Sequence, residues 1–317
     1  MNLKLISTIA LLCLWATSYG QVTDAEAKLK TQTKDSLDGW KVNFSVGATL
    51  AQTNLSNWAA GGQSSYAVSG GFSTSANYKN GKNAWDNSLD IGYGILNQED
   101  IKYTKKTDDK IDILSKYGRK AKNNFYYAAL LNFKTQMSTG YNYPNDSTRT
   151  KISNVLAPGY LVGALGIDYK PNSYISMFAS PITSKFTFVN DTALSNAGAF
   201  GVEKGEKIKS EFGGYVRFIY SKNDFQSELL KNIIFTTKLD LFSNYVEEPQ
   251  NIVVNWETQI ALEINKHISV NINTYLIYDD KVKIGKDSNN DGTIQENEKK
   301  PRLQFKELFG AGVAFKF

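Results

Sequence analysis

The feature that most constrains the fold is an alternation of apolar and polar residues over long stretches. WKVNFSVGATLAQ, residues 40–52, puts Trp40, Val42 and Phe44 on one face and Lys41 on the other. A period of two is that of a β-strand, because successive side chains point to opposite faces. The length of the stretch is that of a tilted, membrane-crossing strand. Each such stretch therefore predicts a strand with one apolar and one polar face.

Similar stretches recur to the end of the chain, and the connections between them alternate between long and short. NGK, KN and PN are short, whereas YNYPNDSTRTKISN is long. Transmembrane barrels have short periplasmic turns and longer outer loops, and an even number of strands puts both termini on the periplasmic side. We predict an all-β fold, a transmembrane antiparallel up-and-down β-barrel of about 12 strands. The predicted strands are 40–52, 64–79, 83–97, 109–121, 124–138, 157–170, 173–185, 209–221, 231–245, 252–265, 267–279 and 302–317.

The alternative fold is a soluble sandwich or lipocalin-like barrel, whose strands also alternate but turn their apolar side inward. Strand length and the asymmetry of the connections favour the membrane barrel, as do aromatic residues near strand ends. The sequence also ends on Phe317, and a final strand closing on Phe is typical of outer-membrane barrels. The aromatic residues are Trp40, Tyr78, Trp85, Tyr169, Tyr245 and Tyr278.

The first twenty residues predict export. Residues 1–20 combine Lys4, an apolar run and small residues before Gln21, as a signal peptide does. Cleavage would remove Cys13, the only cysteine, and leave 35 basic residues, one fewer than the whole chain, against 31 acidic ones. These charges are interleaved along the chain, which argues against a nucleic-acid partner. The predicted organisation is a signal peptide at 1–20, a polar periplasmic lead-in at 21–39 and an outer-membrane barrel at 40–317 of a Gram-negative envelope.

Several blocks carry a resemblance to a known family. LSNWAAGG, WDNSLDIGYG, APGYLVGALGIDYKPN, KLDLFSNYVEEPQNIVVNWE and RLQFKELFGAGVAF resemble a Bacteroidota-type family of secreted outer-membrane barrels catalogued as a domain of unknown function. The resemblance implies an outer-membrane location and contact with outer-membrane lipid. It brings no substrate, and so it implies no catalytic residue.

Charged residues fall on the face opposite the apolar one in several predicted strands, so they are candidates for the barrel lumen. Such charges must be paired or hydrated. They fit either a mixed-sign network that fills and stiffens a narrow barrel, or a narrow aqueous path with ion preference. The candidates are Asp86, Asp90, Lys134, Asp168, Arg217, Lys238, Asp240, Glu257 and Glu263.

The stretch DSNNDGTIQENE, residues 287–298, matches the spacing of an EF-hand calcium loop. Its flanks predict strands instead of helices, which makes it a candidate for a structural Ca²⁺ site in the last outer loop. The alternative is a polar loop that matches the calcium motif only because of its composition. The expected ligands are Asp287, Asn289, Asp291, the Thr293 carbonyl, Gln295 through water, and Glu298.

The sequence offers little for catalysis. His267 is the only histidine, and it falls in a predicted periplasmic turn with no nucleophile placed beside it. Trp58, in the outer loop NWAAGG, is a candidate for partner contact. We therefore expect a non-enzymatic accessory or scaffold subunit of a cell-envelope complex, in contact with other outer-membrane proteins. A porin-like, narrow channel for small polar solutes is the alternative.

Overall fold

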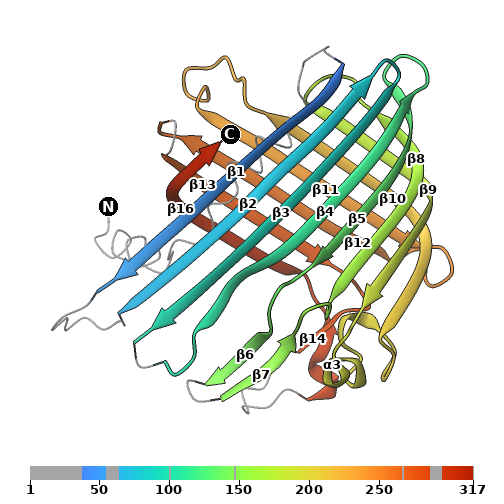
Figure 1. The fold of residues 1–317 in the computed structure, drawn as a ribbon. Helices are drawn as coiled ribbons and strands as arrows, with labels where there is room; N and C mark the ends of the chain where they lie inside the picture. The colour runs from blue at the N-terminus through green and yellow to red at the C-terminus, as the bar shows by residue number, and fades with distance from the viewer. Residues whose placement is uncertain are drawn as a thin grey trace, which may run out of the picture.

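The computed structural model describes residues 38–54, 64–99, 101–145, 148–265, 268–285 and 295–316. Twelve antiparallel strands form a closed barrel in the order β1-β16-β13-β12-β11-β10-β9-β8-β5-β4-β3-β2 (Figure 1). They are β1 (Gly39–Thr53), β2 (Ser65–Asn80), β3 (Asn83–Gln98), β4 (Lys105–Lys120), β5 (Phe125–Thr135), β8 (Gly159–Tyr169), β9 (Ile175–Phe188), β10 (Ile208–Lys222), β11 (Ile233–Asn244), β12 (Ile252–Glu263), β13 (Ile268–Tyr278) and β16 (Gln304–Lys316). The prediction of an antiparallel up-and-down barrel is confirmed.

The first and last barrel strands close the ring. β1 pairs with β16 from Ser45↔Lys316 to Ala48↔Val313. Both ends of the barrel chain therefore lie at the end that carries the short turns. The long connections gather at the opposite end and hold the remaining elements (Figure 1). These elements are β6 (Gly140–Asn145), β7 (Thr148–Ser153), α3 (Thr192–Asn196), η1 (Ala199–Gly201), β14 (Lys283–Gly285), η2 (Glu296–Glu298) and β15 (Lys299–Pro301).

A β-bulge lies in the middle of β9 and changes which residues face inward. Between Ala179 and Ile182, β9 has one residue more than the facing stretch of β8. Pro181 occupies this bulge, where its lack of an N–H removes no ladder hydrogen bond. Gly166 of β8 faces it, and a Cβ there would lie 2.1 Å from the carbonyl oxygen of Ala179. The strand predicted over 173–185 runs on to Phe188, because the bulge lets the strand continue through the proline.

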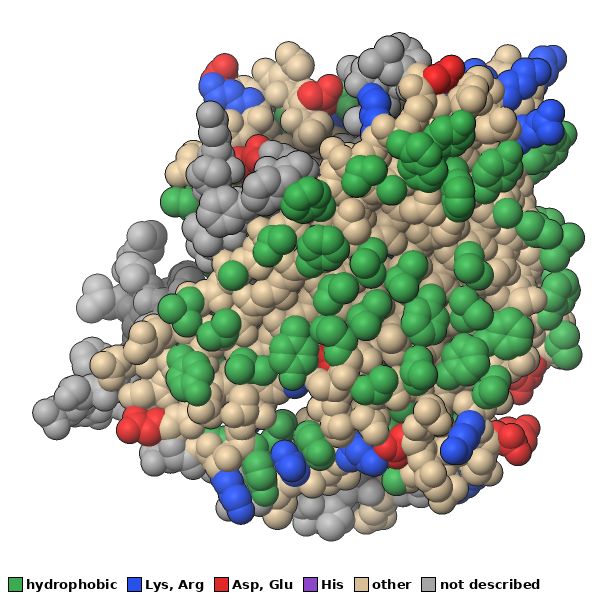
Figure 2. All heavy atoms as spheres, viewed as in Figure 1, with side chains coloured by type: hydrophobic (Ala, Val, Ile, Leu, Met, Phe, Trp, Pro, Cys, Tyr) green, Lys and Arg blue, Asp and Glu red, His purple; other side chains and the backbone are tan. Residues whose placement is uncertain are grey.

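The outer surface of the barrel is apolar. Side chains such as Leu50, Val42 and Leu165 are 70%, 63% and 56% exposed. Figure 2 shows hydrophobic side chains over the middle of the barrel wall, with Lys, Arg, Asp and Glu gathered near its two ends. Buried polar side chains, among them Asp168 and Arg217, lie on the inner face. Among the described residues, no helix has the length and apolar character needed to cross a membrane.

Aromatic side chains form two groups on the outer surface. At the short-turn end, Trp40 contacts Tyr78 and Trp85, with ring centroids 5.1 and 5.7 Å apart. At the other end, Phe212 and Tyr245 make an edge-to-face contact at 6.0 Å. An apolar band bordered by aromatic residues is typical of the outer surface of transmembrane barrels.

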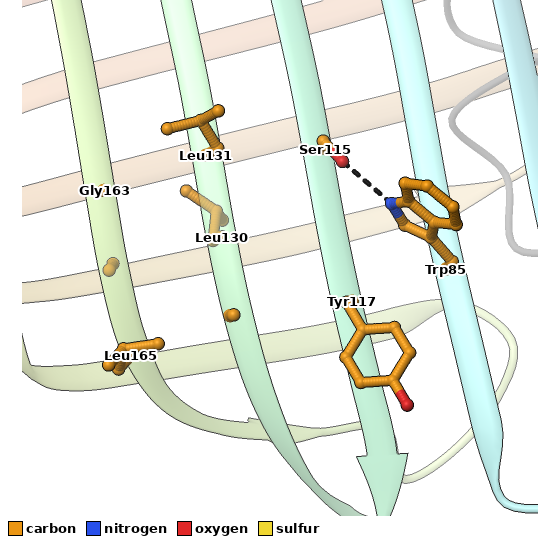
Figure 3. A pocket seen from close by; sticks show the side chains of 9 residues that line it. Trp85, Ser115, Tyr117, Leu130, Leu131, Gly163 and Leu165 are labelled. Carbon is orange, nitrogen blue, oxygen red and sulfur yellow. Dashed lines mark hydrogen bonds between the residues drawn. The ribbon is translucent and has the colours of Figure 1, made fainter.

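A shallow hollow interrupts the outer wall where β4, β5 and β8 lie side by side. The small residues Ala129 and Gly163 leave a space of about 610 Å³ between larger apolar side chains (Figure 3). At its edge, the Trp85 Nε1–H donates to Ser115 Oγ at 2.8 Å. This bond satisfies the indole donor on an otherwise apolar surface.

Candidate functional site: the charged lumen

The inner face of the barrel carries a network of ion pairs, and one of its most buried pairs joins β10 to β11. Arg217 Nε and Nη2 donate to the two carboxylate oxygens of Asp240 at 2.6 and 2.9 Å. Tyr215 Oη also donates to Asp240, at 2.8 Å. The side chains of Arg217 and Asp240 are only 5% and 8% exposed. The guanidinium group thus binds the carboxylate through two parallel hydrogen bonds, and the Tyr215 hydroxyl adds a third. A buried carboxylate needs such partners to offset the loss of water.

Lys134 extends the network across the lumen. Its ammonium group on β5 lies 3.5 Å from Asp112 of β4 and 3.4 Å from Glu257 of β12. Glu257 also pairs with Lys238 of the neighbouring β11, at 2.9 Å. β5 and β12 are five positions apart in a ring of twelve, so the Lys134–Glu257 contact joins nearly opposite walls.

A second cluster lies nearer the short-turn end. Asp168 of β8 accepts from Lys116 at 2.7 Å and from Ser176 at 2.8 Å. Lys170, in the turn after β8, lies 3.5 Å from Asp168 and 3.1 Å from Asp86 of β3. These contacts connect one side of the wall, from β3 to β9.

A third cluster lies toward the long connections. Glu211 lies 3.1 Å from Lys185 and 3.3 Å from Lys209. Lys185 also lies 3.8 Å from Asp279, which follows β13. Across this end, Lys306 of β16 pairs with Asp108 of β4 at 3.0 Å.

The sequence-predicted lumen residues take different places in this network. Asp90 accepts a hydrogen bond from Ser73 at 2.7 Å and is 3% exposed. Glu263 lies at the end of β12, partly buried. The others occur in the first two clusters: Asp86, Lys134, Asp168, Arg217, Lys238, Asp240 and Glu257.

Sequence reasoning missed several members of the network. In β4, Asp112 and Lys116 lie at even-numbered positions, whereas Ile111 and Ile113 lie at odd-numbered ones. This alternation was the sequence signal that could have placed Asp112 and Lys116 on the inner face. Lys185 faces inward only because the bulge at Pro181 shifts the parity of β9.

The long connections cover part of the barrel mouth. Asp191 caps the N-terminus of α3, accepting from the backbone N–H of Ala193 at 3.1 Å and of Leu194 at 3.2 Å. It also accepts from Lys151 of β7 at 2.5 Å and from Asn154 at 3.0 Å. The hydrogen bonds from Lys151 and Asn154 lower the pKa of Asp191 to about 2. One carboxylate thus ties the β6–β7 hairpin to the helical segment.

A cavity of about 370 Å³ lies between this cover and the ion pairs. Tyr160 and Gln304 line it near the mouth, where β8 and β16 begin. Asn132 and Asp240 line it toward the middle of the barrel. Phe200, from the segment after α3, contributes to the cover.

Only the C-terminal part of the predicted calcium loop is described. Asp287, Asn289, Asp291 and Thr293 lie outside the described residues, as do Trp58 and His267. The Gln295 backbone N–H donates to Glu298 Oε2 at 3.0 Å, and Glu298 is buried. β14 and β15 pair on either side, from Lys283↔Pro301 to Gly285↔Lys299. The two ends of the stretch are therefore held together by two short strands, which lie between the predicted barrel strands 267–279 and 302–317 and were not predicted.

The fold and the site define an antiparallel barrel with an apolar exterior and a charged lumen. Residues 50–141 match the family described as "Protein of unknown function (DUF3078)", which confirms the resemblance to a catalogued domain of unknown function. That description assigns no activity. A comparison with curated proteins gives no match.

Solved barrel structures are similar to this chain over most of its length. The translocator domain of the autotransporter NalP from Neisseria meningitidis is 9% identical with a TM-score of 0.38, covering 93% of each chain. An outer membrane channel from Pseudomonas putida F1 is 8% identical with a TM-score of 0.40, covering 91% of this chain and 98% of its own. The toluene transporter TbuX from Ralstonia pickettii is 11% identical with a TM-score of 0.29, covering 95% and 98%.

Proposed function

We propose that this chain is an integral barrel of the outer membrane whose lumen is closed, and that it serves as a non-enzymatic accessory or scaffold subunit of an envelope complex. The apolar exterior between two aromatic groups supports the membrane location, because such a surface is stable against lipid and unfavourable in water. A lipid setting also suits a closed ring, in which each barrel strand pairs with a neighbour on either side.

The closed lumen rests on the contact between Lys134 and Glu257. This pair joins nearly opposite walls at 3.4 Å, and each partner has a further ion pair, with Asp112 and Lys238 respectively. A hydrated ion moving along the axis would have to separate these charges. Pairs of opposite charge also give the lumen no strong preference for cations or anions. A selective pore needs such a preference. Stiffening of the barrel is therefore the role that we assign to the network.

Conductance tests the closed lumen. We expect the purified chain in a planar lipid bilayer to show no steady current, whereas Lys134→Ser combined with Glu257→Ser gives measurable openings. Glu228→Gln, an exposed carboxylate in the turn before β11, is the control and stays silent. Steady current from the wild-type chain would overturn the proposal. The alternative, a narrow channel for small polar solutes, would then replace it, supported by the cavity on the long-connection side.

Affinity purification tests the accessory role. A tagged copy is extracted from native outer membranes in mild detergent, and the proteins that co-purify are identified. We expect a stoichiometric set of partners, including other outer-membrane proteins. Recovery of the barrel alone, also in calcium-containing buffer, would refute the scaffold role.

We also propose that the 287–298 stretch binds a structural Ca²⁺. Two kinds of observation support this proposal. The spacing of the motif is that of a calcium loop. The paired β14 and β15 hold the ends of the stretch together, and the hydrogen bond from the Gln295 backbone N–H fixes the Glu298 carboxylate. Asp291→Ala should abolish saturable calcium binding and protease resistance of the loop, whereas Asn290→Ala, at a non-ligand position, should preserve both. Equal calcium affinity in the two variants would eliminate the site.

A further inference from the structure

The cavity in the barrel mouth has the size and enclosure of a small-molecule site. Its volume of about 370 Å³ lies within the range of ligand pockets. Its walls come from both sides of the barrel, from β5 and β8 to β12 and β16. Phe200 and Val282, from two of the long connections, lie at its outer side. A molecule in this cavity would contact rigid strands below and connections above.

The charges in the wall already have partners inside the protein. Lys134 pairs with Asp112 and Glu257, and Asp240 with Arg217. Lys185 pairs with Glu211, and it also lies 3.8 Å from Asp279. A ligand with a net charge would have to compete with one of these pairs. The electrostatics of the wall therefore favour an uncharged ligand.

Three uncharged polar side chains in the wall still have hydrogen-bonding capacity. Tyr160, Asn255 and Gln304 line the cavity, and their side-chain polar atoms form no hydrogen bond with other described residues. A phenol and two amides provide both donors and acceptors. Such a set suits a ligand whose groups both donate and accept, as hydroxyl groups do.

Apolar surface completes the wall. Phe242 and Val162 lie on strands, and Phe200 faces the cavity from the cover. Phe200 has a positive φ of 58°, which is unfavourable for a bulky residue. The buried cluster of Ala157, Val189, Leu194 and Val202, against which it packs, holds it there. The cavity thus combines hydrogen-bonding groups with apolar and aromatic faces.

We propose that this cavity binds a small, uncharged, polyhydroxylated molecule of mono- or disaccharide size. The hydroxyl groups would bond to Tyr160, Asn255 and Gln304, while a C–H face of the sugar ring packs on Phe242 or Phe200. The site goes beyond the scaffold role and does not depend on it, because it needs only the barrel mouth and its cover.

The test uses the full mature chain in nanodiscs prepared without alkyl glycosides, because detergents with sugar headgroups would occupy the site. Glucose and maltose are the uncharged probes, and glucuronate and glucosamine the charged comparators; binding is measured by calorimetry and by ligand-observed NMR. Val162→Phe fills the cavity, and Leu161→Phe adds the same ring to the outer face of the same strand. Tyr160→Phe removes one hydroxyl group without changing the shape of the wall.

We expect saturable binding of an uncharged sugar that Leu161→Phe leaves intact and Val162→Phe abolishes. Tyr160→Phe should weaken it about fivefold, the effect of losing one hydrogen bond. Should Val162→Phe fail to fold, the comparison of Tyr160→Phe with wild type still decides. Absence of saturable binding overturns the proposal, as does tighter binding of either charged probe. Equal affinity in wild type and Tyr160→Phe does so too.

Discussion

The buried pair of Arg217 and Asp240 allows a quantitative test of the lumen network. Arg217→Met keeps much of the side-chain length and removes the charge. Asp240 would then keep the hydrogen bond from Tyr215 and lose both bonds from the guanidinium group. Removing one partner of a buried ion pair costs about 3–5 kcal/mol, because the other charge stays buried without compensation. The remaining Tyr215 bond and the neighbouring Lys238 place the expected loss at the lower end, about 3 kcal/mol.

The assay is urea unfolding of the barrel in lipid vesicles, followed by tryptophan fluorescence and by the gel shift of the folded form. Lys231→Met is the matched control, because Lys231 pairs with Glu228 at 2.6 Å but both side chains are exposed, by 54% and 89%. Loss of such a surface pair costs about 0.2–1 kcal/mol.

A double variant separates charge from packing. Arg217→Met with Asp240→Leu leaves no unpaired charge, so it should recover most of the stability lost in Arg217→Met. A loss below about 1 kcal/mol in the single variant would refute the reasoning, since it would mean that water screens Asp240 in the lumen. A double variant as unstable as the single one would assign the effect to packing.

Two further predictions concern the bulge and the mouth. Gly166→Ala should destabilise the barrel by about 2 kcal/mol in the same unfolding assay, because the added Cβ meets the backbone of Ala179. Gly163→Ala is the control and should be neutral, because its Cβ meets no atom within 4 Å. The pKa of Asp191 is near 4 in the unfolded chain and about 2 in the folded protein. Ionised Asp191 therefore stabilises the fold above about pH 4, and this stabilisation is lost as the pH falls toward about 2. Amide exchange of residues 192–196 should therefore be faster in Asp191→Asn than in wild type at pH 6 and similar at pH 2; a difference unchanged at pH 2 would contradict this.

Strand positions and facing could be predicted from the sequence wherever alternation is regular. In β12, Glu257 and Glu263 alternate with Trp256 and Leu262, and the structure puts Trp256 and Leu262 on the exposed side. Period two fails where a bulge inserts one residue, and a proline such as Pro181 indicates a strand end as readily as a bulge. Lys185 was therefore missed although it contacts Glu211 and Asp279.

The long connections were the other limit. The stretch YNYPNDSTRTKISN, residues 141–154, predicts a long connection, yet most of the β6–β7 hairpin lies in it. The α3 segment also shows no pattern in the sequence, because five residues are too few for a helical period to show. Hairpin and helix are joined through Asp191, a contact between segments forty residues apart in sequence that local patterns do not contain. The cavity depends on this cover, so sequence reasoning could not find it.

The ion pairs and the cavity follow from one property of the strands. A strand that is apolar on its lipid-facing side carries polar residues at every second position, so a narrow barrel must accommodate inward charges. Pairing Lys134 with Glu257 across the lumen satisfies them where the walls are bridged. Near the mouth, uncharged Tyr160 and Asn255 face the lumen, and the space beside them is wide enough for a ligand. Filling this space with Val162→Phe should leave the conductance of the barrel unchanged while abolishing sugar binding, because Val162 takes no part in the bridge between Lys134 and Glu257, although Lys134 also lines the cavity.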